Sequence, residues 1–202
     1  MIELEKDGDL WIVTINRPAK ANSLTEDMLA ELVGIANAAT DARALILTGK
    51  GRVFSAGADL DAARAGLAVS PLWEQLSGAI AALPGFTIAA LNGTLAGGAT
   101  GMALACDLRL AVPSARFFYP VMKLGYLPQP SDPKRMISLI GPARTKLILM
   151  GGQKLEAPEA LHFGLIDRIV DPDILLTTAR EIAADTLVAK PEIAKGIKAL
   201  CS

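Results

Sequence analysis

The chain has 202 residues, of which 51% are hydrophobic and 20% are charged, and its formal net charge is −1. This composition fits one globular domain with a substantial core and excludes a disordered chain. The near-neutral charge and the 4% aromatic content argue against a nucleic-acid partner, whose binding needs a basic excess or stacking platforms. The amino-terminal stretch MIELEKDGDL and the two cysteines, Cys106 and Cys201, predict a cytoplasmic protein without a metal site or a disulfide framework.

The first half of the chain alternates between predicted strands and helices. Short apolar runs ended by turn residues indicate strands, and capping residues or prolines mark helix starts. The predicted elements are a β-hairpin over 2–15, a helix capped by Thr25, a buried strand at 44–48, a short helix at 62–67, a helix from Pro71 to before Pro84, a buried strand at 86–91, a helix at about 98–105 and a strand at 108–112. This order predicts an α/β domain.

The second half is predicted to be mainly helical. Residues 113–135 contain five prolines and are expected to be loop-rich. The predicted elements that follow are helices opening at Pro142, Pro158, Pro172 and Pro191, with a short strand at 165–170.

The uncharged segment 86–106 raises an alternative, a membrane-spanning helix, because about 20 apolar residues can cross a bilayer. Asn92, Thr94 and several glycines lower its hydrophobicity and would break such a helix. A buried strand, a loop and a buried helix fit better, and we expect no membrane partner.

Two glycine-rich segments carry the chemistry, FSAGADL at 54–60 and NGTLAGGATGMALACDLRL at 92–110. Each follows a predicted strand and leads into a possible helix, whose first N–H groups suit an oxygen anion. Small residues let a ligand approach the backbone, so the two segments could give two donors to one oxygen. The alternative is that Gly97 and Gly98 only permit tight strand–helix packing.

Five segments in series resemble the crotonase (enoyl-CoA hydratase/isomerase) superfamily. They are NRPAKANSL at 16–24, LILTGKGRVFSAGADL at 45–60, IAALNGTLAGGATGMALACDLRLAV at 88–112, ARFFYPVMKLGYLP at 115–128 and GPARTKLILMGGQKLEAPEALHFGLIDRIV at 141–170. The resemblance implies an α/β crotonase/ClpP-like fold of repeated ββα units with a helical carboxy-terminal part. Residues 1–190 would form the acyl-CoA-binding domain, and 191–202 a short carboxy-terminal helix in place of a longer trimerisation region.

The resemblance also implies a ligand and the residues that hold it. The ligand is an acyl-CoA thioester, with coenzyme A as part of the substrate rather than a covalently bound cofactor, and the assembly is a homotrimer or a dimer of trimers. Two backbone N–H groups, assigned to Ala56 and Gly98, would polarise the thioester carbonyl and stabilise an enolate. The positions matched to coenzyme A contacts are Lys20, Ala21, Ala56, Gly57, Ala58, Asp59 and Leu60. Asp59 could equally cap the helix that follows.

Hydratases of the superfamily use two glutamates to position and activate water, and both are missing. Gly101 stands three residues after Gly98 where the first is expected, and Val121 follows Pro120 where the second is expected. Neither side chain transfers a proton, so the sequence predicts that water addition by the usual mechanism is severely impaired. Isomerisation, decarboxylation or hydrolysis through a thioester enolate are the alternatives, and a non-catalytic acyl-CoA-binding protein or subunit is another.

Replacement groups for these acids are expected within 119–135. The candidates are Tyr119, Lys123, Tyr126, Gln129, Asp132, Lys134 and Arg135. Asp132 is the best candidate for a general base, and the alternative is a turn or cap formed by its Ser-Asp-Pro context. His162, the only histidine, and Asp107 are expected to have structural roles. A ClpP-like serine protease would need a nucleophilic serine in the GGATG segment at 97–101, which contains none.

Overall fold

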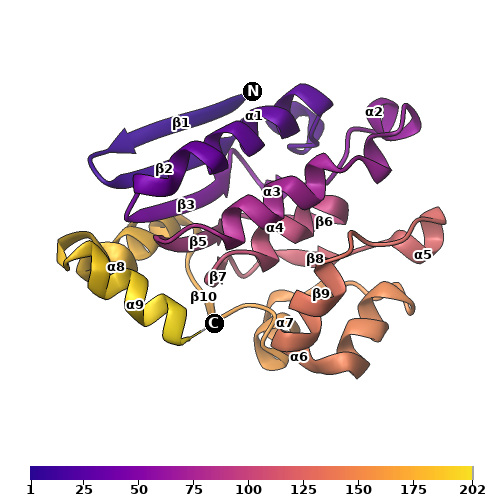
Figure 1. Cartoon of the computed structure of the whole chain (residues 1–202). Coiled ribbons are helices and arrows are strands. Elements are labelled where there is room, and N and C mark those ends of the chain that lie inside the picture. Colours follow the sequence, from indigo (N-terminus) through magenta and orange to yellow (C-terminus); the bar gives the residue numbers. More distant parts are fainter. Residues whose placement is uncertain (202) are drawn as a thin grey trace.

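The computed structural model describes residues 1–201, which form two β-sheets with helices packed around them (Figure 1). The larger sheet has the order β1-β2-β3-β5-β7-β10, and its strands are β1 (Ile2–Asp7), β2 (Leu10–Ile15), β3 (Ala44–Gly49), β5 (Phe86–Leu91), β7 (Leu108–Ala111) and β10 (Arg168–Ile169). The smaller sheet has the order β4-β6-β8-β9, and its strands are β4 (Val53–Ser55), β6 (Thr94–Ala96), β8 (Arg116–Phe118) and β9 (Leu155–Glu156).

The larger sheet contains the strands that the apolar runs predict. β1 and β2 form the expected antiparallel hairpin, with Ile2 opposite Ile15. β3 lies between β2 and β5 and is parallel to both, and β5 pairs in parallel with β7. β3 and β5 are buried almost throughout, which explains why they read as continuous apolar runs rather than alternating ones.

The helices cover the sheets and end the chain. The α-helices are α1 (Glu26–Ala38), α2 (Leu60–Arg64), α3 (Leu72–Ala81), α4 (Thr100–Leu104), α5 (Val121–Leu124), α6 (Asp132–Leu149), α7 (Ala157–Phe163), α8 (Leu175–Val188) and α9 (Pro191–Leu200). The 3-10 helices are η1 (Pro18–Lys20), η2 (Ala39–Asp41), η3 (Leu67–Val69), η4 (Gly97–Ala99) and η5 (Pro172–Ile174). Thr25 caps α1 as predicted, since its side chain accepts a hydrogen bond from Met28 N.

The repeat predicted from the resemblance is present. A strand of the larger sheet is followed by a short strand of the smaller sheet and then by a helix, in the series β3-β4-α2, β5-β6-α4 and β7-β8-α5. The fold is therefore the predicted α/β fold of ββα units with a helical carboxy-terminal part.

Several boundaries differ from the predictions. α2 begins at Leu60 rather than at residue 62, because the Asp59 side chain accepts from the N–H groups of Asp61 and Ala62. Residues 113–135 are not only loop, since they contain β8, α5 and the start of α6. α6 is broken at Gly141, whose φ of +77° is left-handed, so Pro142 does open a helical segment. The predicted strand at 165–170 is limited to β10.

The segment 86–106 is not a single helix. It contains β5, β6, η4 and α4, so the alternative of a membrane-spanning helix is wrong for this segment. Across residues 1–201, the structure has no helix with both the length and the apolar character needed to span a bilayer.

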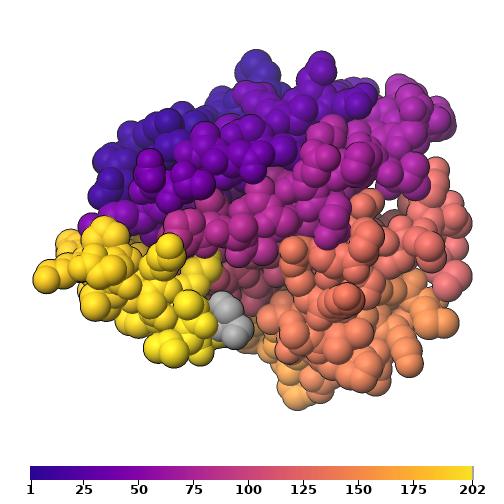
Figure 2. Space-filling model, viewed as in Figure 1, coloured from indigo at the N-terminus to yellow at the C-terminus, as the bar shows by residue number. Residues whose placement is uncertain are grey.

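The helices α8 and α9, yellow in Figure 2, lie apart from the orange region of α6 and α7 on the face shown there. α9 has no buried residue, and its Lys198 Nζ donates to Gly85 O at 2.7 Å and to Asp107 Oδ2 at 2.8 Å. Asp107 also accepts from Thr87 N and Thr87 Oγ1, which fits the structural role predicted for it. The division into 1–190 and 191–202 stays a prediction, and residue 202 lies outside the described residues.

Asn22 links the 17–22 segment to β4 through buried hydrogen bonds. It is fully buried and has a left-handed φ of +54°. Its Oδ1 accepts from Arg17 N at 2.8 Å, and its Nδ2 donates to Lys50 O at 2.9 Å and Val53 O at 2.6 Å. Ser55 Oγ donates to the carbonyl of Asn22 at 2.8 Å. The side-chain amide and the backbone carbonyl of Asn22 therefore tie the 17–22 segment to the start and the end of β4, respectively.

We expect Asn22→Ala to lower the free energy of unfolding by about 3 kcal/mol. Buried polar groups left without partners cost about 1–3 kcal/mol each, and alanine in the left-handed region costs about 1–2 kcal/mol. Urea unfolding followed by circular dichroism measures the change. Asn37→Ala on the exposed side of α1 is the control and should stay within about 0.5 kcal/mol of the wild type. Equal stabilities for the two variants would refute the role given to Asn22.

Candidate active site

A cavity of about 250 Å³ opens where the two glycine-rich segments meet. Its walls come from the loop after β4, from α2, α3 and η4, and from the β8–α5 segment. The residues that line it are Ala56, Ala58, Leu60, Ala63, Ala68, Trp73, Ala96, Gly97, Gly98, Phe118, Tyr119, Pro120, Val121, Leu124, Tyr126 and Leu127. None of these side chains is charged at neutral pH, and the polar side-chain groups among them are the hydroxyls of Tyr119 and Tyr126 and the indole N–H of Trp73.

The two glycine-rich segments touch through their backbones. Gly57 has a φ of +87°, and a Cβ on it would lie 2.9 Å from the carbonyl oxygen of Ala96 and 3.4 Å from the nitrogen of Gly98. Any larger residue at position 57 would push the segments apart. Gly57 therefore sets the spacing between Ala58 on one side and Gly98 on the other.

The backbone hydrogen bonds decide which N–H group of the first segment is available. Ala56 N already donates to the carbonyl of Ala21 at 3.0 Å, which contradicts the assignment of an oxyanion donor to Ala56. Ala58 forms a parallel bridge with Leu24, in which Leu24 N donates to Gly57 O and Asp59 N donates to Leu24 O. Because this bridge uses the groups on either side of Ala58, the N–H of Ala58 points away from Leu24. The bridge therefore makes the N–H of Ala58, rather than that of Ala56, the candidate donor of this segment.

Gly98 lies in η4, at the start of the helical run that continues into α4. The first N–H groups of a helix have no acceptor within the helix, so this position suits a donor to a ligand. A Cβ on Gly98 would lie 3.0 Å from the ring of Trp73. Trp73 is buried, and its Nε1 donates to Leu67 O at 2.8 Å, which fixes the ring against the glycine. No sequence pattern indicates this contact.

The remaining predicted ligand contacts lie partly at this cavity and partly in the neighbouring 17–22 segment and the cap of α2. Asp59 caps α2 and forms an ion pair with Arg17 at 2.8 Å, and this hydrogen bond lowers the pKa of the Asp59 carboxyl. The capping interpretation of Asp59 is thus confirmed. Leu60 is 75% exposed at the cavity rim, and Lys20 is exposed at the end of η1. Ala21 contributes the carbonyl that engages Ala56.

The position of the first expected glutamate is filled from another helix. A Cβ on Gly101 would lie 2.6 Å from Oδ1 of Asp132, the first residue of α6. Asp132 is fully buried, and its Oδ2 accepts from the hydroxyl of Tyr119 at 3.0 Å. Oδ1 has no hydrogen-bond partner within residues 1–201, so the carboxylate does not cap α6. The turn in the Ser-Asp-Pro alternative is present, since Asp132 N donates to Gln129 O at 3.1 Å. Val121, at the second position, is buried in the apolar lining.

Burial raises the pKa of Asp132 to about 6, although the hydrogen bond from Tyr119 and the charge of Arg135 oppose this shift. The charge of Glu74 acts in the same direction as burial. Burial also raises the pKa of the Tyr119 hydroxyl, and the charge of Asp132 adds to this shift. A carboxyl with a pKa close to neutrality is suited to proton transfer.

The other candidates from 119–135 are dispersed. Lys123 and Lys134 are exposed, and Tyr126 lies in the cavity wall. The Gln129 N–H donates to the Tyr119 hydroxyl at 3.5 Å, and Arg135 Nη1 donates to Ser131 Oγ at 2.5 Å. Farther along the chain, His162 is exposed on α7.

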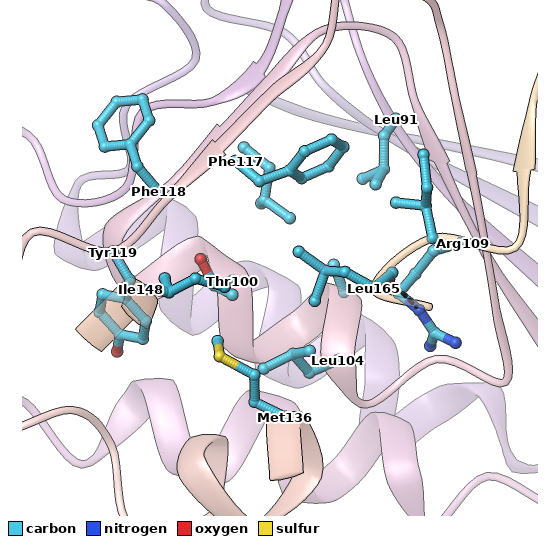
Figure 3. Close-up of a pocket in the computed structure, with 13 residues that line it drawn as sticks. Leu91, Thr100, Leu104, Arg109, Phe117, Phe118, Tyr119, Met136, Ile148 and Leu165 are labelled. Carbon is cyan, nitrogen blue, oxygen red and sulfur yellow. Dashed lines mark hydrogen bonds between the residues drawn. The ribbon is translucent and has the colours of Figure 1, made fainter. Parts of the chain in front are cut away.

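Tyr119 lies between the cavity at the glycine loops and a second, smaller one. The smaller cavity has a volume of about 10 Å³, which is room for one water at most. Figure 3 shows its apolar walls, including Phe117, Leu91 and Leu165, with the Tyr119 hydroxyl at the lower left. This space is too small for an acyl group, unlike the cavity of about 250 Å³ at the glycine loops.

Comparisons with known proteins agree with this geometry. The family model for enoyl-CoA hydratase/isomerase matches residues 5–201. The chain is 36% identical over 189 residues to a short-chain-enoyl-CoA hydratase of Clostridium acetobutylicum, covering 89% of this chain and 72% of that protein. It is 34% identical over 195 residues to a crotonyl-CoA hydratase of Syntrophomonas wolfei, covering 92% and 75%.

Solved structures show the same similarity. Pseudomonas aeruginosa DspI superposes with a TM-score of 0.90 at 32% identity, over 99% of this chain and 85% of that one. An enoyl-CoA hydratase from Bacillus anthracis superposes with a TM-score of 0.89 at 32% identity, over 98% and 80%. From the matched fold, the glycine loops and these relatives, the chain belongs to the enoyl-CoA hydratase/isomerase family of the crotonase superfamily.

Proposed function

We propose that this protein binds an acyl-CoA thioester and activates it through the N–H groups of Ala58 and Gly98. The observation that carries the proposal is the pair of adjoining glycine loops, which brings these two residues to one cavity. The thioester oxygen would accept both hydrogen bonds, and the acyl group would lie against Trp73 and Phe118. Membership of the family supports an acyl-CoA ligand.

The two N–H groups favour an enolate over the neutral thioester, because negative charge grows on the oxygen as a bond at the α-carbon breaks. Removing one such donor from an acyl-transfer enzyme costs about 3 kcal/mol of activation free energy. Both donors belong to backbone fixed by Gly57 and by the hydrogen bonds of Leu24, so little reorganisation accompanies the reaction. This makes chemistry through a thioester enolate the reaction class we propose.

Within that class, standard two-glutamate hydration is the reaction that the cavity supports least. The lining has no carboxylate, and Val121 presents a hydrocarbon where a water-activating acid is expected. The apolar lining also favours an uncharged acyl group over a carboxylated one, which disfavours decarboxylation relative to isomerisation or hydrolysis. Relatives at 34–36% identity are named hydratases. The proposal that this protein catalyses a different reaction therefore depends on the two glutamates that are missing at Gly101 and Val121.

A second candidate function is binding without turnover, as an acyl-CoA carrier, sensor or subunit. The absence of charged side chains from the cavity lining favours it. In either case the proposal includes coenzyme A contacts with Lys20, Ala21 and residues 57–60, a homotrimer or dimer of trimers, and a cytoplasmic location.

Binding can be tested with tryptophan fluorescence. The chain has two tryptophans, so Trp11→Phe leaves Trp73 as the only one. We expect butyryl-CoA to change the emission of Trp73 in this variant, because the ring packs on Gly98, and we expect free butyrate to leave it unchanged. Isothermal titration calorimetry of the wild type provides the matching affinity. A protein that binds neither butyryl-CoA nor crotonyl-CoA at millimolar concentration would disprove the proposed function.

Hydration can be tested directly with crotonyl-CoA. We expect the loss of enoyl absorbance to run close to the uncatalysed rate, because general acid–base groups contribute about 10²–10⁴-fold each and the two expected ones are absent. A family hydratase with both glutamates serves as the positive control. Rapid hydration by the wild type, insensitive to substitutions within 119–135, would show that another group activates the water.

A further inference from the structure

A carboxylate and an empty side-chain position share one place beside the cavity. Oδ1 of Asp132 lies 2.6 Å from the point where a Cβ on Gly101 would stand, and the other carboxylate atoms lie 3.2 Å from it. Gly101 follows Gly98 by one turn of helix, a spacing that puts such residues about 5–6 Å apart. The carboxylate therefore lies about one helical turn from Gly98, which lines the cavity.

The carboxylate of Asp132 is buried, and only one of its two oxygens has a hydrogen-bond partner within residues 1–201. Oδ1 has no hydrogen-bond partner within residues 1–201, although Asp132 is fully buried. Leaving a buried charged oxygen unpaired is costly, and such groups often have a functional role. Oδ2 accepts from the Tyr119 hydroxyl, whose ring forms part of the cavity wall. Asp132 is thus connected to the cavity through one tyrosine.

No cationic side chain within residues 1–201 forms a salt bridge with the carboxylate of Asp132. α4 contributes only Gly101 at this point and has no charged residue. α3 contributes Glu74, which accepts from Ser131 N and Oγ, and α6 contributes Arg135, which donates to the same Ser131 Oγ. Among residues 1–201, Tyr119 is the side chain that hydrogen-bonds the carboxylate. No salt bridge within residues 1–201 fixes the ionised form of Asp132.

We propose that Tyr119 and Asp132 form a proton relay for the thioester, and that Gly101 is the positioning residue that admits Asp132 to this place. The inference rests on the proposed function. In the enolising direction, a lone pair of the Tyr119 oxygen takes the proton from the α-carbon while the phenolic proton passes to Oδ2 of Asp132. The C–H electron pair becomes the enolate, held by the N–H groups of Ala58 and Gly98. Reversal of both transfers returns the proton to carbon.

The relay has two physical advantages. The tyrosine exchanges one proton for another and never becomes a free phenolate, so its raised pKa is no obstacle. The proton ends on Asp132, whose pKa of about 6 lets it both accept and return a proton near neutral pH. Tyr119 is the catalytic residue in this scheme, and Asp132 acts through it.

The relay is tested by exchange of the α-protons of butyryl-CoA in D₂O, followed by NMR. We expect the wild type to catalyse exchange with a rate that rises with pH through about 6 and then levels, because Asp132 must be ionised to accept the proton. Asp132→Asn and Tyr119→Phe should each reduce exchange at least about 100-fold while butyryl-CoA still binds. The double variant should lose little more than either single variant, because the residues act as one unit.

Controls separate this relay from a structural role and from the proposed function. Asp185→Asn, on the exposed side of α8, should leave exchange and its pH profile unchanged. Wild-type exchange rates in folded Asp132→Asn or Tyr119→Phe would overturn the relay, as would a wild type that binds butyryl-CoA without exchanging its protons. A wild type that does not bind at all would overturn the proposed function, and the relay with it.

The role of Gly101 is tested with Gly101→Ala. The added Cβ must displace the Asp132 carboxylate, so we expect at least about a tenfold loss of exchange and an unfolding temperature lower by about 5 °C. Gly78→Ala on α3 is the matched control, since a Cβ there meets nothing within 4 Å. The penalty of Gly101→Ala should shrink in an Asp132→Ala background. An equal penalty with and without the carboxylate would overturn the assignment of Gly101.

Discussion

The backbone contact between Gly57 and the Ala96–Gly98 segment is the constraint on which the whole site depends. β4 and β6 pair in parallel, so the loops that follow them leave the smaller sheet at the same edge. Only the missing side chain of Gly57 lets these loops meet, because a Cβ there would lie 2.9 Å from a carbonyl oxygen. Ala58 and Gly98, from distant parts of the sequence, thereby line one cavity.

The positions of the two loops are also fixed by hydrogen bonds and an ion pair from the 17–22 segment. Asn22 ties the 17–22 segment to β4, and Ala21 engages the N–H of Ala56. Arg17 joins Asp59 and thereby the cap of α2. An electrostatic site gains most when its dipoles are fixed before the ligand arrives. The left-handed backbone at Ala21 and Asn22 is the strain that this fixing costs.

The sequence predicted the elements that have a physical signature of their own. β3 and β5 are buried apolar runs, and α1 starts at a capping threonine. β4, β6, β8 and β9 have two or three residues, too few for any periodicity, so they could not be found. The motif likewise located the first loop but not its donor. Whether Ala56 or Ala58 faces the cavity depends on the hydrogen bonds to Ala21 and Leu24, which sequence spacing does not reveal.

Family membership supports the proposed ligand class more directly than any one reaction, because the two depend on different groups of the protein. The N–H donors are backbone groups, so they survive almost any change of neighbouring side chains. Proton transfer depends on individual side chains, and these are exchangeable between elements. A Cβ at residue 101 and the carboxylate of Asp132 compete for one space, so an acid carried by α4 and an acid carried by α6 exclude each other here. An acid on either helix leaves the N–H groups of Ala58 and Gly98 unchanged, because these belong to the main chain of other segments.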